Sequence, residues 1–140
     1  GRPHIAQAMV RSGHVGDIHE AFDKWLGTDC PAFVPRIGPL PTTVIGVIHA
    51  AGGLVSLAHP GLTSIDENIK ALQQAGLDAI EVYHSRHSVE DRDRYLAIAR
   101  KLGLFVTGGS DYHGNEHHRG RLGKMSLPEV EWNRMKQYLN

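Results

Sequence analysis

Short apolar runs alternate with helical patterns along most of the chain. Helical periodicity is found at about 5–11, 17–26, 43–51, 64–76, 88–102 and 128–139. The short apolar runs that predict strands are Leu54–Ala58, read as a buried strand, Ala79–Tyr83 and Leu104–Thr107. Alternation of this kind is typical of βα units, in which helices connect parallel strands. We therefore expect an α/β fold with parallel strands and flanking helices.

Local signals mark where several of these elements begin and end. Ser64 with Glu67 has the spacing of a capping box, and Ser88 with Asp91 is expected to open another helix, which Gly103 stops. Four prolines between Pro31 and Pro41 exclude a regular element there. The chain is thus predicted to divide into residues 1–40, a small helical cap with a proline-rich connection, and residues 41–140, which hold the βα units.

Composition narrows the classes of protein to consider. The 140 residues are 41% hydrophobic and 21% charged, which is typical of a globular domain. Fifteen basic residues balance fifteen acidic ones, so no overall charge draws the chain to nucleic acid or to anionic lipid. Cys30 is the single cysteine, which suits a reducing cytoplasm, and with no long apolar run or leader-like segment we expect no membrane partner.

Histidine is the residue type that points to chemistry. The chain has ten, and five lie close together in sequence: His84, His87, His113, His117 and His118. Polar residues also follow each predicted strand, namely His59 after the first, Glu81 with His84 and His87 at the second, and Asp111 with His113 after the third. Parallel strands bring their carboxyl ends to one edge, where ligands bind. A carboxylate among imidazoles suits Mn²⁺, Zn²⁺ or Fe²⁺.

Each candidate also has a simpler interpretation. His59 could hydrogen-bond a neighbouring loop, and Asp111 with His113 could form an Asx-turn in a glycine-rich loop. His117 and His118 fit an exposed charged loop, while His14, His19 and His49 fall at helical positions where surface or half-buried roles are expected.

The first residues of the chain carry a further candidate site. Arg2 and His4 precede a helix and could hold a phosphate with the helix N–H groups, or belong to a frayed end. Glycine-rich nucleotide motifs of the Rossmann and P-loop types and the G-x-S-x-G elbow do not occur in the chain. Metal-assisted chemistry is the mechanism that remains.

Three motifs together resemble a known family. Leu57-Ala58-His59-Pro60-Gly61, Ile80-Glu81-Val82 and Gly109-Ser110-Asp111-Tyr112-His113-Gly114, preceded by Gly1-Arg2-Pro3-His4, look like the C-terminal half of the PHP (polymerase and histidinol phosphatase) metal-dependent phosphoesterases. The nearest branch contains nucleoside 3′,5′-bisphosphate phosphatases and 5′-to-3′ exonucleases. The resemblance implies the C-terminal part of a distorted (βα)₇ barrel that holds two or three divalent ions, Mn²⁺, Zn²⁺ or Fe²⁺.

The same resemblance assigns roles to individual residues. His59, Asp111 and His113 match metal ligands, and Arg2 and His4 match positions that contact the substrate phosphate. Glu81 and His87 match recurrent residues that we place around the ligands rather than on the metal. A phosphoesterase of this kind hydrolyses phosphate esters with a metal-bound hydroxide. The implied substrates are phosphorylated small molecules, such as nucleotides, or short oligonucleotides.

The chain lacks the N-terminal motifs of this family. The Asp-x-His-x-His and Thr-Asp-His motifs are absent, and the chain begins at Gly1 rather than Met. We therefore expect a truncated, inactive piece that depends on the missing N-terminal half of its own domain. Two alternatives stay open: a small-molecule phosphatase of the histidinol phosphatase type, and a non-catalytic PHP domain.

Overall fold

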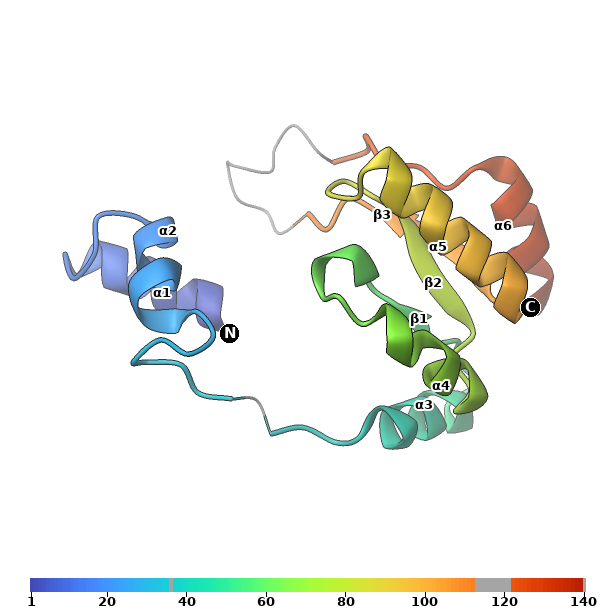
Figure 1. Ribbon diagram of the computed structural model, residues 1–140, viewed down its shortest axis with the longest axis horizontal. Coiled ribbons are helices and arrows are strands. Elements are labelled where there is room, and N and C mark those ends of the chain that lie inside the picture. The colour runs from blue at the N-terminus through green and yellow to red at the C-terminus, as the bar shows by residue number, and fades with distance from the viewer. Residues whose placement is uncertain (36, 113–121, 140) are drawn as a thin grey trace. The chain divides into compact units, whose positions relative to one another are not determined.

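The computed structural model describes residues 1–35, 37–112 and 122–139, which form two compact units (Figure 1). The first unit is Gly1–Gly38 and the second is Pro39–Asn140. Each unit has a hydrophobic cluster of its own, so the two are described separately.

The first unit consists of short helices. Helix α1 is Arg2–Arg11, α2 is Ile18–Ala21, and a π-helical turn, η1, follows at Phe22–Leu26. The apolar residues that these elements bury together are Ala6, Val15, Ala21 and Leu26. Helix α1 begins three residues earlier than the apolar pattern predicts, because a proline at its start supplies helical backbone without needing a hydrogen-bond partner.

The second unit contains a parallel sheet of three strands among the described residues. The strands are β1 (Ser56–Leu57), β2 (Ala79–His84) and β3 (Phe105–Gly109), in the order β1-β2-β3. Ala79 pairs with Ser56 on one side and with Phe105 on the other. The predicted α/β architecture with parallel strands is confirmed, and all three carboxyl ends lie at the same edge of the sheet.

Helices flank this sheet. They are α3 (Pro41–Ala50), α4 (Ile69–Gln74), α5 (Val89–Leu102) and α6 (Glu129–Met135), with 3₁₀ turns η2 (Pro60–Leu62), η3 (Asp66–Asn68) and η5 (Lys136–Tyr138). Figure 1 shows α5 running along the sheet, where it packs against β2 and β3. The core between them contains Ile69, Leu77, Ile80, Val82, Tyr95, Ala99, Leu104 and Val106. β2, the central strand of the described sheet, contributes Ile80 and Val82 to this core.

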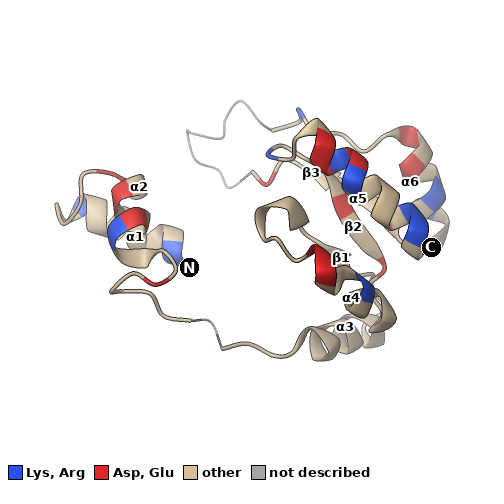
Figure 2. Cartoon of the chain, viewed as in Figure 1, with Lys and Arg blue, Asp and Glu red and all other residues tan. Residues whose placement is uncertain are grey.

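Helix α5 has the ends that its sequence predicts. The Ser88 hydroxyl accepts the backbone N–H of Asp91 at 3.1 Å, and the Asp91 carboxylate accepts the backbone N–H of Ser88 at 3.1 Å. Gly103 ends the helix in the left-handed conformation. Figure 2 shows acidic residues at the start of α5 and basic residues in its last turn, the arrangement that the helix dipole favours.

The structure corrects two predictions for the segment from Leu54 to α4, namely the capping box and the extent and burial of the strand. Ser64 adopts a left-handed φ of 50°, and the helix begins at Ile69 after a 3₁₀ turn, so the capping box with Glu67 does not form. The Leu54–Ala58 run pairs only at Ser56 and Leu57, and Leu54 is 36% exposed. Within the described residues β1 has one neighbouring strand, which leaves its other side open.

No described helix has the length and apolar character needed to cross a membrane.

Candidate metal centre

The carboxyl edge of the sheet brings together three of the polar residues that follow the strands. His59 lies two residues after β1, His84 is the last residue of β2, and Asp111 lies two residues after β3. The ring centroids of His59 and His84 are 5.4 Å apart, and His84 Nε2 is 3.9 Å from Asp111 Oδ2. The described residues thus place two imidazoles and a carboxylate around one small region.

The turn that carries His59 is held in an uncommon backbone conformation. His59 has φ 31° and ψ 56°, the left-handed region that few residues other than glycine adopt. Its backbone N–H donates to Glu81 Oε2 at 2.8 Å. The next residue, Pro60, is buried and starts η2. Glu81 on the central strand therefore fixes the point at which His59 leaves β1.

His87, which follows β2, contacts the same turn at Gly61. Its Nδ1–H donates to the Val82 carbonyl at 2.9 Å, and its Nε2 accepts the Gly61 N–H at 3.3 Å. A Cβ on Gly61 would lie 3.0 Å from this ring, so glycine allows the close approach without displacing the ring. Both ring nitrogens of His87 are occupied within the protein, which leaves His87 to support the turn.

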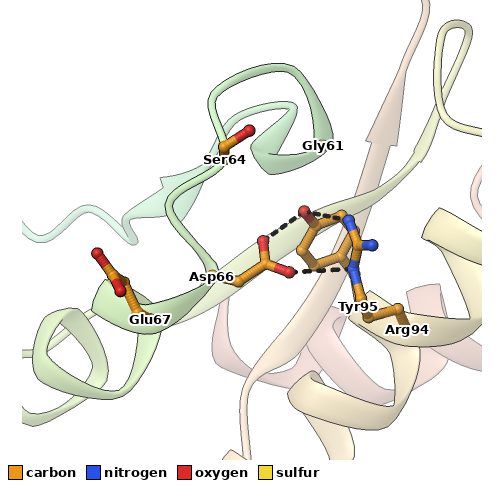
Figure 3. Close-up of a pocket in the computed structure, with 6 residues that line it drawn as sticks. All are labelled: Gly61, Ser64, Asp66, Glu67, Arg94 and Tyr95. Carbon is orange, nitrogen blue, oxygen red and sulfur yellow. Dashed lines mark hydrogen bonds and ion pairs between the residues drawn. The ribbon is translucent and has the colours of Figure 1, made fainter.

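Tyr95 extends this support to α5. Its ring centroid lies 5.5 Å from that of His87, and its hydroxyl donates to Asp66 Oδ1 at 2.6 Å. Figure 3 shows the Asp66 carboxylate also joined to the Arg94 guanidinium, at 3.0 Å, beside a pocket lined by Gly61, Ser64, Asp66, Glu67, Arg94 and Tyr95. Burial, followed by the Asp66 hydrogen bond, raises the pKa of Tyr95. Arg94, the one arginine that lines this pocket, is already paired with Asp66. The contacts of Asp66 with Arg94 and Tyr95 therefore connect the segment after the turn to α5.

Two imidazole nitrogens at the sheet edge are buried without a hydrogen-bond partner. They are His59 Nδ1 and His84 Nε2. The side chain of His84 is completely buried, and burial lowers its pKa, although the nearby Glu81 carboxylate opposes the shift. An unsatisfied buried polar group costs roughly 1–3 kcal/mol, so each of these atoms requires a partner that the described residues do not supply. Imidazole nitrogen with carboxylate oxygen is a donor set that suits a divalent transition ion.

The structure describes two of the three predicted metal ligands. His59 and Asp111 each lie beside His84 at the sheet edge, while His113 lies outside the described residues, as do His117 and His118. Within the described ranges no group of three or more His, Cys, Asp or Glu side chains is placed so that it could hold a metal ion. The residues present therefore fit a partial site, to which other ligands have to be added.

The two predicted phosphate contacts belong to the first unit. Arg2 Nη1 donates to the Leu26 carbonyl at 3.2 Å, and its guanidinium lies 5.6 Å from the centroid of the Phe33 ring. His4 Nδ1 is 3.3 Å from the N-terminal nitrogen. Both residues lie in the first turn of α1. Their role in binding phosphate stays a prediction.

His84 is the residue of this site that sequence reasoning did not assign. Its place at the end of a strand brings it to the carboxyl edge, but the sequence does not show that its ring is completely buried. Ile80, Val82 and His84 occupy alternate positions of β2 and are all buried, so the period-two spacing with two apolar residues is the sequence signal that could have found it.

Comparison with known proteins identifies relatives of the chain. No family model matches. The chain is 35% identical over 117 residues to a 3′,5′-nucleoside bisphosphate phosphatase of Chromobacterium violaceum, covering 80% of this chain and 41% of the relative. It is 30% identical over 117 residues to the 5′-3′ exoribonuclease Rnm of Escherichia coli, covering 80% and 40%. The chain is a homologue of these phosphoesterases. The predicted family resemblance is confirmed by these relatives, whose names are those of hydrolases that act on phosphate esters.

A solved structure extends the similarity to the whole chain. A Bifidobacterium adolescentis protein assigned as a metal-dependent phosphoesterase superposes with a TM-score of 0.81 at 33% identity, covering 99% of this chain and 50% of that one. The phosphoesterase homologue therefore spans about two fifths of the curated relatives and half of the solved structure.

Proposed function

We propose that the chain forms the C-terminal part of a metal-dependent phosphoesterase and supplies part of its metal centre. The observation that carries this proposal is that His59, His84 and Asp111 lie together at the carboxyl edge of the sheet, where His59 Nδ1 is buried without a hydrogen-bond partner. The relatives are about twice as long as the chain, which supports a centre completed by further residues.

In this proposal residues 41–140 are part of a distorted (βα)₇ barrel, and residues 1–40 are a helical cap with its connection. The parallel order of β1, β2 and β3 with flanking helices is the arrangement that such a barrel repeats. His59, Asp111 and His113 would hold divalent ions, two or three of them in the whole enzyme, with Mn²⁺, Zn²⁺ and Fe²⁺ as the candidates. Bound ions of this kind supply Lewis-acid chemistry, which activates water and polarises a phosphoryl group.

The chain's own residues position this chemistry. Glu81 and His87 hold the turn that presents His59, one through the His59 N–H and the other through the Gly61 N–H. The His84 ring, which is completely buried, lies between His59 and Asp111. Arg2 and His4 would bind the phosphate of the substrate, since a guanidinium offers several N–H donors to phosphate oxygens.

The substrate class follows from the relatives. One is named for a nucleoside 3′,5′-bisphosphate and the other for RNA, so nucleotides or short oligonucleotides are the proposed phosphate esters. A phosphatase of the histidinol phosphate type remains the alternative, and the two differ in which ester releases phosphate.

Metal content of the purified chain is the decisive experiment. Elemental analysis is carried out on the chain, on the double variant Asp111→Ala/His113→Ala, and on His19→Ala, whose exposed histidine is the matched control. We expect Mn, Fe or Zn in the chain and in the control but not in the double variant. Equal metal in all three proteins would contradict the ligand assignment.

Activity is tested in a chimaera. The corresponding C-terminal segment of the Chromobacterium relative is replaced by this chain, and phosphate release is measured from a nucleoside 3′,5′-bisphosphate and from histidinol phosphate. We expect release from the first ester only, and its loss in the Asp111→Ala/His113→Ala chimaera. A folded, metal-loaded chimaera that releases phosphate from neither ester would contradict the proposed function.

A further inference from the structure

The protonation of the His84 ring can be read from its hydrogen bonds. The backbone N–H of Arg86 donates to His84 Nδ1 at 3.2 Å. A backbone N–H is a donor only, so Nδ1 has to be the unprotonated nitrogen of the ring. In a neutral imidazole the proton then lies on Nε2. His84 therefore presents an N–H group, rather than a lone pair, at the edge of the sheet.

This Nε2–H group is buried and has no acceptor within hydrogen-bond distance among the described residues. The groups around the His84 ring are His59, His87, Glu81 and Asp111. His87 uses both of its ring nitrogens elsewhere, and Asp111 is the one carboxylate among the described residues within 4.0 Å of a His84 ring nitrogen. Asp111 Oδ2, at 3.9 Å from Nε2, is the acceptor that a small movement of the strand end brings into reach.

We propose that His84 is a positioning residue whose Nε2–H donates to the Asp111 carboxylate and orients that carboxylate toward the metal. The proton position follows from the contacts of the ring alone, while the purpose of the hydrogen bond rests on the proposed function, in which Asp111 is a ligand. A carboxylate that accepts one N–H on one oxygen turns its other oxygen in a fixed direction. Groups that hold ligands in this way commonly change metal affinity 10-fold to 100-fold.

The proton position is tested directly by NMR on the metal-free chain labelled with ¹⁵N-histidine. We expect the His84 spin system to show a protonated Nε2 and an unprotonated Nδ1. His87 is an internal reference, because its contacts require the opposite tautomer, with the proton on Nδ1. An unprotonated Nε2 on His84 would overturn the proposal, since that atom would then be available as a metal ligand.

The positioning role is tested by Mn²⁺ titration of matched variants. His84→Gln keeps an N–H donor near the position of Nε2, whereas His84→Leu fills similar space without a donor. We expect about 10-fold weaker Mn²⁺ binding for His84→Leu and near-normal binding for His84→Gln. Circular dichroism and thermal unfolding identify a variant that fails to fold, in which case the Gln variant and the NMR measurement still decide.

The outcomes separate this inference from the proposed function. Equal weakening by both substitutions, or none by either, would overturn the positioning role. If the unsubstituted chain binds no Mn²⁺, the metal-directed purpose of His84 falls with the ligand assignment, whereas the NMR result still decides the proton position. A loss of binding in Asp111→Ala with the His84 tautomer unchanged would support both.

Discussion

The Glu81 carboxylate and the backbone of His59 are joined across two neighbouring strands by a 2.8 Å hydrogen bond. This bond reaches from the central strand to the first residue of the His-Pro-Gly turn, where the backbone has a left-handed φ of 31°. A left-handed conformation at a residue other than glycine persists only when its surroundings hold it. The contact thus sets the direction in which the imidazole of His59 leaves the sheet.

We expect Glu81→Ala to destabilise the second unit and to reduce metal binding. A hydrogen bond to a charged group contributes about 1.5–3 kcal/mol, and its loss would also release the His59 turn. Urea unfolding gives the change in free energy, and elemental analysis gives the metal content. Glu81→Gln, which keeps an acceptor oxygen, should lose less stability than Glu81→Ala. Equal losses of stability in the two variants would show that the hydrogen bond from the His59 N–H to Glu81 Oε2 does not contribute to the free energy of unfolding.

The sequence predicts the elements whose signals are local. The strand at Ala79–His84 and the helix that follows it both agree with the pattern of the chain, the helix because Ser88, Asp91 and Gly103 act through contacts with their own neighbours. The prediction of a capping box at Ser64 is wrong because contacts with distant residues decide the structure of that segment. Asp66 is drawn to Tyr95 and Arg94, about 29 residues along the chain, and these distant contacts impose a 3₁₀ turn where the local signal favours a helix.

The positions of the candidate site residues are predictable from the sequence, but their hydrogen bonds are not. His59 and Asp111 follow strands, and the rule that parallel strands share a carboxyl edge is enough to place both near one another. The proton on His84 depends on the backbone N–H of Arg86, and the occupation of His87 depends on Gly61 and Val82. Such details require the actual path of the turns, which residue types and spacing do not specify.

The close approach of Gly61 to His87 provides a second prediction. In Gly61→Ala the new Cβ would lie 3.0 Å from the His87 ring and 3.4 Å from Tyr95. We expect a loss of roughly 1–3 kcal/mol in the free energy of unfolding, as is usual for overpacking.

The matched control is Gly46→Ala, in the interior of α3, where a Cβ would meet nothing within 4 Å. Since glycine is a poor helix former, that variant should gain roughly 0.5–1 kcal/mol. Thermal unfolding of both variants measures the difference. Similar shifts in the same direction would show that His87 and Tyr95 can move aside.

The buried carboxylate of Glu131 provides a third prediction. Glu131 is 3% exposed and forms two hydrogen bonds with the Arg100 guanidinium, which joins α6 to α5. Arg100→Met leaves the carboxylate buried with only Arg134 at 3.8 Å among the described residues. Because Arg100 is itself partly exposed, we expect the free energy of unfolding to fall by about 2 kcal/mol in this variant. That loss is below the usual range for breaking a fully buried ion pair.

A double variant distinguishes the pair from the general loss of a large side chain. Arg100→Met/Glu131→Met removes both charges, so it should be more stable than Arg100→Met alone. Urea unfolding of the two single variants and the double variant measures the coupling. Simple addition of the two single effects would show that the ion pair contributes little.

The buried ring of His84 provides a prediction on pH. Burial lowers its pKa in the folded protein below the ordinary value of 6.5. The Glu81 and Asp111 carboxylates oppose this shift, whereas His87 and His59 add to it. Just below pH 6.5 the unfolded chain therefore binds more protons than the folded one. The stability linked to this ring is present in full above pH 6.5 and is lost as the pH falls from there toward the lowered pKa.

We expect the free energy of unfolding of the metal-free chain to fall in this range by at most about 1.4 kcal/mol per pH unit from His84. Urea unfolding at a series of pH values, with a chelator present, gives the slope. His84→Gln should flatten it, because glutamine takes up no proton, whereas His19→Gln, at an exposed position, should leave it unchanged. A slope that persists in His84→Gln would assign the proton uptake to other groups and would mean that burial of the His84 ring costs its charged form little.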